Sequence, residues 1–136
     1  MALVVGADAE SLVKGYVQTV IDGGQLPTPP AGASWTVKTI ITPGITPAWT
    51  IQVRMIGGVD EQRVAERPLV DLRVWADGTT NTDGIRSATA RALLARVRSQ
   101  FSCSVFALPV PLPDPADNSK VHTLFTVQLL VKGSQQ

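Results

Sequence analysis

The sequence predicts an α+β protein in which a mainly antiparallel β-sheet carries two helices packed on one face. In two runs the apolar residues have the spacing of an amphipathic helix. The other apolar runs alternate as strands do or consist of residues typical of strands, and clusters of turn residues separate the runs. The predicted order of elements is α–β–β–β–α–β–β, without an internal repeat. A chain of 136 residues can bury its own core, so we predict a single domain over residues 1–136, with flexible ends at 1–7 and 133–136.

The composition excludes several classes of protein. Hydrophobic residues make up 44% and charged residues 17% of the chain, and the net charge is +1, which argues against a disordered tail or a basic nucleic-acid-binding domain. The single cysteine, Cys103, excludes an intrachain disulfide and is interpreted as a small buried hydrophobe. The N-terminus lacks the basic region of a signal peptide, and no apolar run is long enough for a membrane span. We therefore expect a soluble protein made in the cytosol.

The first helix is predicted to begin at Asp8, whose side chain can cap it, and to end at Gly23–Gly24, where a glycine adopts positive φ. Glu10 and Lys14 lie on its polar face, in the i, i+4 order that favours an ion pair. The apolar residues fall on one broad face, which can cover a sheet: Leu12, Val13, Tyr16, Val17, Val20 and Ile21.

The next two runs are strand-like. After a proline-rich connector at 25–33, the runs Ser34–Thr42 and Ala48–Ile56 alternate apolar and polar residues. Residues 42–47, TPGITP, are typical of a tight turn. The two runs are therefore predicted to form a β-hairpin.

A long connection follows the hairpin. The segment Gly57–Arg67 begins with glycine, is charged and exceeds the usual length of a hairpin connection. We interpret it either as an extended arm or functional loop, or as a solvated charged loop. Residues 68–76 then alternate as a third strand, with Val70, Leu72 and Val74 inward and Asp71 and Arg73 outward.

Residues 82–101 predict the second helix, which Thr82, Asn81 or Asp83 can cap. On a helical wheel this run has a core-facing stripe, formed by Ala90, Leu93, Leu94, Val97 and Phe101. A second face carries small residues and a third is polar; they consist of Ala88, Ala92 and Ala95, and of Ser87, Arg91 and Arg98. Such a helix can contact its own sheet and, through the small residues, a neighbouring copy of the chain.

Three prolines mark the run Ser104–Pro113. Alternate residues of a strand direct their N–H and C=O groups to the same edge, so Pro109, Pro111 and Pro113 remove the donors of one edge. We therefore predict a strand at the edge of the sheet, protected against strand addition. A turn is predicted at 114–119.

The sequence contains no catalytic constellation. The single histidine, His122, lies on the polar parity of the last predicted strand, 121–131, and is interpreted as an exposed residue. Neither metal-ligand spacing, nor a phosphate loop, nor a nucleophile elbow is present. Asp71 and Asp77 are too far apart along a strand to act as a pair, and Asp71 is expected to pair with an arginine across the strand. We therefore expect no enzymatic activity, no metal and no cofactor.

The second helix is locally basic, because Arg86, Arg91, Arg96 and Arg98 outnumber Asp83. One interpretation is a surface that faces nucleic acid or another charged partner. The other is a solvated helix face, with arginines favoured near the C-terminus by the helix dipole. Only Arg91 and Arg98 share a face, and no aromatic residues interleave with them as a single-strand-binding platform requires.

Together these features resemble the tail terminator proteins of long-tailed, non-contractile bacteriophages (siphoviruses), most closely those from phages of actinobacteria. The resemblance covers residues 8–132 and rests on the order and character of the elements. These are the N-terminal helix, the hairpin with its long following loop, the strand LRVWA, the helix IRSATARALLARVRS and the closing strand pair. No short diagnostic motif carries it.

The resemblance implies a structural protein of the virion neck, made in the host cytoplasm. Members of this family form a homo-hexameric ring on the head-proximal end of the tail tube. The ring would contact the tail-tube protein, stop polymerisation of the tube and join head-closure or connector proteins, while DNA passes through it without sequence-specific binding. No membrane is implied. The subunit-contact candidates are Ala88, Ala92, Ala95, Val59, Asp60, Glu61 and Arg63, and the candidates facing the channel are Arg91 and Arg98.

Two alternatives stay open. Another neck component, such as a head-closure or tail-completion protein, would share these features and differ in its position in the virion. A small non-phage α+β domain that binds a peptide or nucleic acid would instead show salt-dependent DNA binding, abolished by Arg91→Ala combined with Arg98→Ala.

Overall fold

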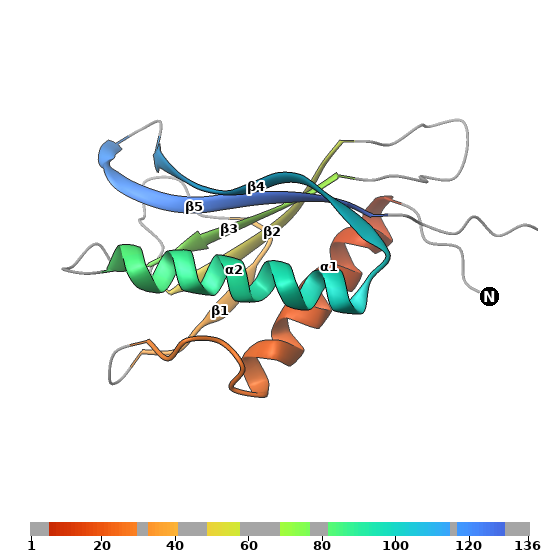
Figure 1. Ribbon diagram of the computed structural model, residues 1–136, viewed down its shortest axis with the longest axis horizontal. Coiled ribbons are helices and arrows are strands. Elements are labelled where there is room, and N and C mark those ends of the chain that lie inside the picture. The colour runs from red at the N-terminus through yellow and green to blue at the C-terminus, as the bar shows by residue number, and fades with distance from the viewer. Residues whose placement is uncertain are drawn as a thin grey trace, which may run out of the picture.

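The computed structural model of the chain describes residues 6–29, 33–40, 49–57, 69–76, 82–114 and 117–129. The order of its elements is α–β–β–β–α–β–β, which confirms the predicted α+β class (Figure 1). The helices are α1 (Gly6–Asp22) and α2 (Thr82–Gln100). The strands are β1 (Thr36–Lys38), β2 (Thr50–Gly57), β3 (Leu69–Trp75), β4 (Cys103–Asp114) and β5 (Asp117–Leu129).

The strands form one sheet in the order β1-β2-β3-β5-β4. Its neighbouring strands are antiparallel, except for the pair β1 and β2. The last described strand in the sequence, β5, lies between β3 and β4 (Figure 1). The helix α2 connects β3 to β4 along the chain. The two edge strands of the sheet are therefore β1 and β4.

The predicted hairpin of the first two strands is wrong. β1 and β2 run parallel, with Thr36 opposite Thr50 and Lys38 opposite Gln52. A parallel pair cannot be closed by a tight turn, because the chain must return to the starting end of the first strand. The alternation of apolar residues identifies strands but carries no information on their direction. The predicted turn at 42–47 lies outside the described residues.

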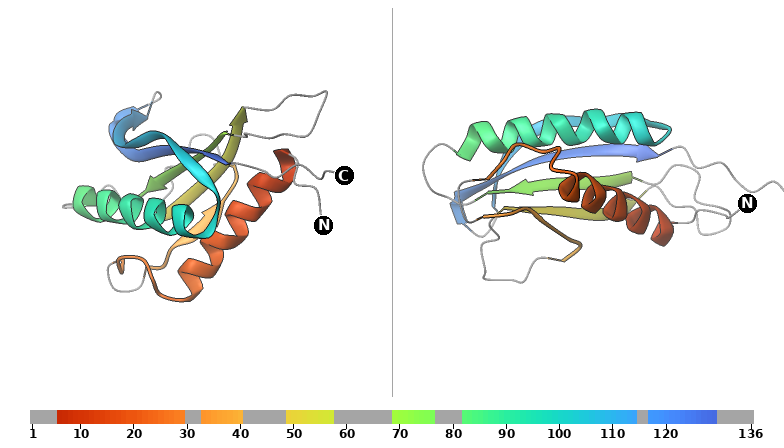
Figure 2. Two further views of the ribbon diagram at one scale, coloured as in Figure 1. Left: turned by 45° about the vertical axis from the view of Figure 1, so that its right-hand side comes forward. Right: turned by 90° about the horizontal axis from the view of Figure 1, so that it is seen from below.

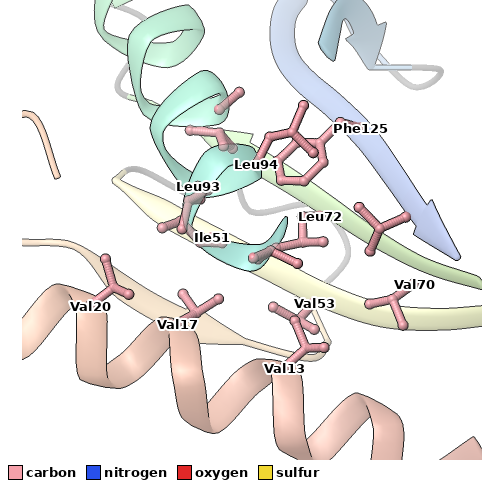
Figure 3. Packing of buried hydrophobic residues seen from close by; sticks show 14 of the residues in the cluster. Val13, Val17, Val20, Ile51, Val53, Val70, Leu72, Leu93, Leu94 and Phe125 are labelled. Carbon is pink, nitrogen blue, oxygen red and sulfur yellow. The ribbon is translucent and has the colours of Figure 1, made fainter. Parts of the chain in front are cut away.

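Both helices pack on one face of the sheet, as predicted (Figures 1 and 2). We call it the helix-covered face. α1 packs on β1 and β2, whereas α2 packs on β3, β5 and β4. The central strands present aliphatic and aromatic residues there in register: Val53 lies opposite Leu72, and Leu72 opposite Phe125. These three side chains are fully buried among residues of both helices (Figure 3).

The predicted core stripe of α2 is confirmed. Ala90, Leu93, Leu94 and Val97 are buried against the sheet, and Phe101 is half-buried beside them. The Phe101 ring meets Tyr16 of α1 edge to face, with 5.6 Å between the ring centroids. This contact joins the C-terminal end of α2 to the middle of α1, so the two helices form one layer.

α1 ends as its glycines predict, but it begins earlier. Gly24 has φ of 65°, its N–H donates to the Ile21 carbonyl, and the Gln25 N–H donates to the Val20 carbonyl. These bonds form a Schellman motif, in which glycine is favoured at positive φ. The helix starts at Gly6, so Asp8 lies in its first turn and does not occupy the predicted N-cap position.

Glu10 of α1 binds the sheet. The Met55 N–H of β2 donates a 2.9 Å hydrogen bond to Glu10 Oε2. This bond lies where the pairing of β2 with β3 shifts register, between Met55 and Gly57. A carboxylate that accepts a backbone N–H at a bulge replaces a missing ladder partner. The side chain therefore fixes the N-terminal part of α1 to the end of β2, a role that the expected pairing with Lys14 does not include.

We expect Glu10→Ala to lower the free energy of unfolding by about 1 to 2 kcal/mol, because the half-buried Met55 N–H loses a charged acceptor. Lys14→Ala on the same helix is the matched control and should cost less than about 0.5 kcal/mol. Urea denaturation of both variants measures the difference. Equal losses would show that the Glu10–Lys14 pair, and not the bond to Met55, carries the effect.

Candidate subunit-contact surfaces

The small-residue face of α2 lies on the side of the helix away from its core stripe. Ala88 and Ala92 are half-buried, Ala92 being packed against the edge of the core, and Ala95 is exposed. The three residues thus share a surface of one helix, as the wheel predicts, and part of that surface is open to solvent. Small side chains allow another backbone to approach closely.

The arginines of α2 occupy different environments. Arg91 and Arg98 are exposed, as expected for residues of the polar face, and Arg96 is half-buried. Arg86 is only 5% exposed, and burial lowers the pKa of its guanidinium. Arg86 therefore does not contribute to a basic surface, and the exposed positive charge of the helix comes mainly from Arg91 and Arg98.

A row of exposed apolar side chains runs along β4. Phe106 and Leu108 are 63% and 68% exposed, and Val110 is 40% exposed. We call these three residues the β4 ridge. This ridge was not predicted, although the sequence carries a signal for it: the run has apolar residues at both alternating positions. An edge strand that turns one set of these residues to the core exposes the other set.

The proline-rich strand lies at the edge of the sheet, as predicted. β4 pairs with β5 alone, with Val110 opposite Leu124 and Leu112 opposite His122. Pro111 lies opposite Thr123, and Pro109 lies where the register shifts between Ala107 and Val110. Neither residue has an N–H, so this half of the edge strand has fewer donors to offer a further strand. The hairpin is tighter than predicted, because Asp117 already pairs with Asp114 and belongs to β5 rather than to a turn at 114–119.

The sheet face opposite the helices carries a buried polar cluster. Asp71 of β3 is 5% exposed, although the alternation predicted it to face outward. Thr126 of β5 donates a 2.6 Å hydrogen bond to Asp71 Oδ1, and Arg73 Nη2 lies 3.5 Å from Oδ2. Asp71 therefore pairs with an arginine of its own strand and not with Arg54, which lies opposite it across the strand.

His122 is buried and not exposed, which corrects the sequence-based prediction. It is 1% exposed, and its ring stacks on Trp75 with 4.3 Å between the ring centroids. Trp75 Nε1 in turn donates to Gln52 Oε1 at 3.4 Å, and Gln52 donates to the Thr39 carbonyl. His122 is therefore covered by Trp75, the residue opposite it on the neighbouring strand β3.

Cys103 at the start of β4 is half-buried and packs against the core, close to the predicted environment. Burial raises the pKa of its thiol, and the nearby charge of Arg98 partly offsets this effect. A thiol with a raised pKa is a weak nucleophile at neutral pH. The remaining contact candidates, Val59, Asp60, Glu61 and Arg63, lie outside the described residues.

Within the part of the chain that the structure describes, no three His, Cys, Asp or Glu residues are placed to hold a metal ion. No helix in this part is long and apolar enough to span a membrane. A scan against models of known protein families finds no match, and a search of curated proteins finds no relative. The surfaces described above are therefore the features from which a function can be argued.

We expect Thr126→Val to lower the free energy of unfolding by about 1.5 to 3 kcal/mol, because the buried Asp71 carboxylate loses its hydroxyl donor. Thr28→Val is the matched control, because Thr28 is exposed in the connector before β1, and the change should stay within about 0.5 kcal/mol. Thermal or urea unfolding of both variants tests this. A Thr126→Val protein as stable as wild type would show that Asp71 does not depend on this hydroxyl.

Replacing Pro109 and Pro111 together by valine should promote self-association beyond that of the wild type, because outward N–H donors return to the edge of the sheet. Light scattering and thioflavin fluorescence over time measure this change. Pro29→Val, in the connector before β1, serves as the control and should behave like wild type. If the double variant is as monodisperse as the control, the prolines do not protect the edge.

Proposed function

We propose that the chain is a tail terminator of a siphovirus: a structural virion protein that forms a hexameric ring at the head-proximal end of the tail tube. The ring stops polymerisation of the tube and joins the tail to the head-closure or connector proteins. The protein acts by assembly and not by catalysis. It is made in the host cytoplasm and functions in the neck of the virion.

The observation that carries the proposal is the β4 ridge. Phe106 and Leu108 expose apolar surface of the kind that marks protein contacts. The same strand carries prolines on its outer edge, so a partner cannot extend the sheet along its C-terminal half. An apolar contact surface on a blocked edge suits a finite assembly, such as a ring, better than an open-ended fibre.

The small-residue face of α2 supports a ring in a second way. Subunits of a ring meet through two different patches, because the contacts are heterologous and close by rotation. Ala88, Ala92 and Ala95 lie on α2, whereas the β4 ridge lies on the edge of the sheet. One subunit therefore offers more than one candidate contact. Arg91 and Arg98 are the exposed residues proposed to face the channel through which DNA passes.

A second candidate function is a small domain that binds nucleic acid or an acidic peptide. The observation in its favour is the exposure of Arg91 and Arg98 on one face of α2. Two arginines supply few phosphate contacts, so any such binding should be weak and strongly dependent on salt. Titration of the purified chain with DNA at two salt concentrations distinguishes this candidate from a ring protein.

The proposal is tested by the mass of the purified chain, alone and after mixing with the tail-tube protein, combined with electron microscopy of the tube ends. We expect a closed ring of about six copies, alone or on the tube. Ala95→Glu, which places a charge on the small-residue face, should reduce ring formation, whereas Gln100→Glu on the same helix should not. A chain that stays monomeric in both conditions and leaves the tubes uncapped would overturn the proposal.

A further inference from the structure

Basic side chains from three neighbouring strands gather on the sheet face opposite the helices. Val37 of β1 packs against the core, so the next residue, Lys38, turns to the opposite face. Lys38 pairs with Gln52 and Gln52 pairs with Arg73, so these residues form one row across β1, β2 and β3. Arg54 comes two residues after Gln52 and therefore lies on the same face, diagonal to both cations of the row.

The centre of this row is fixed by hydrogen bonds. Gln52 is 8% exposed, donates from Nε2 to the Thr39 carbonyl and accepts from Trp75 Nε1. A buried amide that is bonded at both ends keeps one orientation. The strands that carry the cations on either side of it are thus held in place, and a rigid site loses less entropy when it binds a ligand.

The three cations lie close enough to repel one another. Neighbouring strands are about 4.8 Å apart, which puts Lys38 and Arg73 about 10 Å apart at the backbone, with Arg54 about 8 Å from each. Salt screens charges only partly over such distances, because the Debye length is about 8 Å at physiological ionic strength. Lys38 and Arg54 are exposed, and the Arg73 side chain is 36% exposed. Their combined charge therefore favours an anionic group at this face.

The acidic residue of this face does not neutralise the cations. Asp71 is 5% exposed, and its Oδ2 lies 3.5 Å from Arg73 Nη2. Within the described ranges, Lys38 and Arg54 form no ion pair. The other carboxylates whose side chains the structure describes belong to α1, which lies on the helix-covered face (Figure 2). Arg73 also keeps donors for a ligand, because a guanidinium has five N–H groups.

The row of cations continues into aliphatic residues. Arg73 lies opposite Leu124 of β5, and Leu124 lies opposite Val110 of β4. Leu124 is half-buried and Val110 is 40% exposed. The row crosses all five strands and is therefore about 19 Å long. We call its accessible residues the basic–apolar surface: Lys38, Arg54, Arg73, Leu124 and Val110.

We infer that the basic–apolar surface binds an acidic segment of a partner protein. Carboxylates of the segment pair with Lys38, Arg54 and Arg73 through charge-assisted hydrogen bonds. Its aliphatic side chains pack on Leu124 and Val110, away from water. About six residues of extended chain span the row, so a short segment reaches both parts of the surface.

Nucleic acid fits this surface less well. Phosphates would meet the cations but leave the aliphatic end of the row in water, and three cations supply few phosphate contacts. The site is also separate from the exposed pair Arg91 and Arg98, which lies on α2. The inference goes beyond the proposed function and does not depend on assembly of a ring.

Titration of the purified chain with a synthetic peptide tests the inference. The probe has about ten residues, a glutamate-rich half and a leucine-rich half, and a peptide with glutamine in place of glutamate is the neutral control. Lys38→Gln combined with Arg54→Gln removes two exposed charges, whereas Arg73 stays unchanged because it contacts Asp71.

The matched control variant is Arg91→Gln combined with Arg98→Gln, which removes the same charge from an exposed face of α2. Fluorescence anisotropy at two salt concentrations measures the affinity. Two-dimensional amide NMR spectra show whether each variant is folded and which residues the peptide contacts.

We expect wild type and the α2 variant to bind the acidic peptide equally, and the Lys38→Gln, Arg54→Gln variant to bind about tenfold more weakly. Added salt should weaken the binding, and the NMR changes should fall on the five strands and not on α2. No binding at millimolar peptide, equal weakening in both variants, equal binding of the neutral peptide, or displacement by a single-stranded DNA oligonucleotide that binds more tightly would each overturn the inference.

The tube-capping assay separates this inference from the proposed function. Capped tubes without peptide binding would overturn the inference and leave the tail-terminator proposal standing. Peptide binding at the basic–apolar surface with uncapped tubes would do the reverse.

Discussion

The fold depends on β3, the central strand of the sheet, which is buried on both faces. On the helix-covered face, Val70, Leu72 and Val74 of β3 lie in register with residues of β2 and β5, and both helices pack over them. On the opposite face, β3 carries Asp71, whose carboxylate is satisfied by Thr126 of β5 and by Arg73. Burial of a carboxylate is tolerated only when its oxygens find donors. The apolar layer thus supplies the driving force, and the polar layer restricts which strands can be neighbours.

Those parts of the fold that depend on local pattern were predictable from the sequence. The core stripe of α2 follows from helical spacing, the end of α1 from a glycine at positive φ, and the edge position of β4 from the parity of its prolines. The features that were missed depend on contacts between distant segments. The parallel direction of β1, the burial of His122 and the bond between Glu10 and Met55 are each decided by where another element lies.

The candidate surfaces also differ in whether the local sequence pattern predicts them. Arg91, Arg98 and the alanines of α2 could be assigned to helix faces, because a wheel separates a core stripe from the other sides. The β4 ridge could not be recognised in the same way, since apolar residues on both parities of a strand are equally consistent with a strand buried on both faces. Only the position of β4 beyond β5 shows that one side of it faces water. Exposed apolar residues such as Phe106 are therefore a property of topology more than of composition.

The position of β5 in the sheet has a consequence for the synthesis of the protein. Of the five described strands, β5 leaves the ribosome last, yet it lies between β3 and β4 and pairs with both along most of their length. Until its residues have emerged, β4 has no neighbour and the sheet ends at β3. The sheet is therefore completed only after β5 has been translated. A nascent subunit cannot present the finished β4 edge to other copies before β5 has emerged and paired with it.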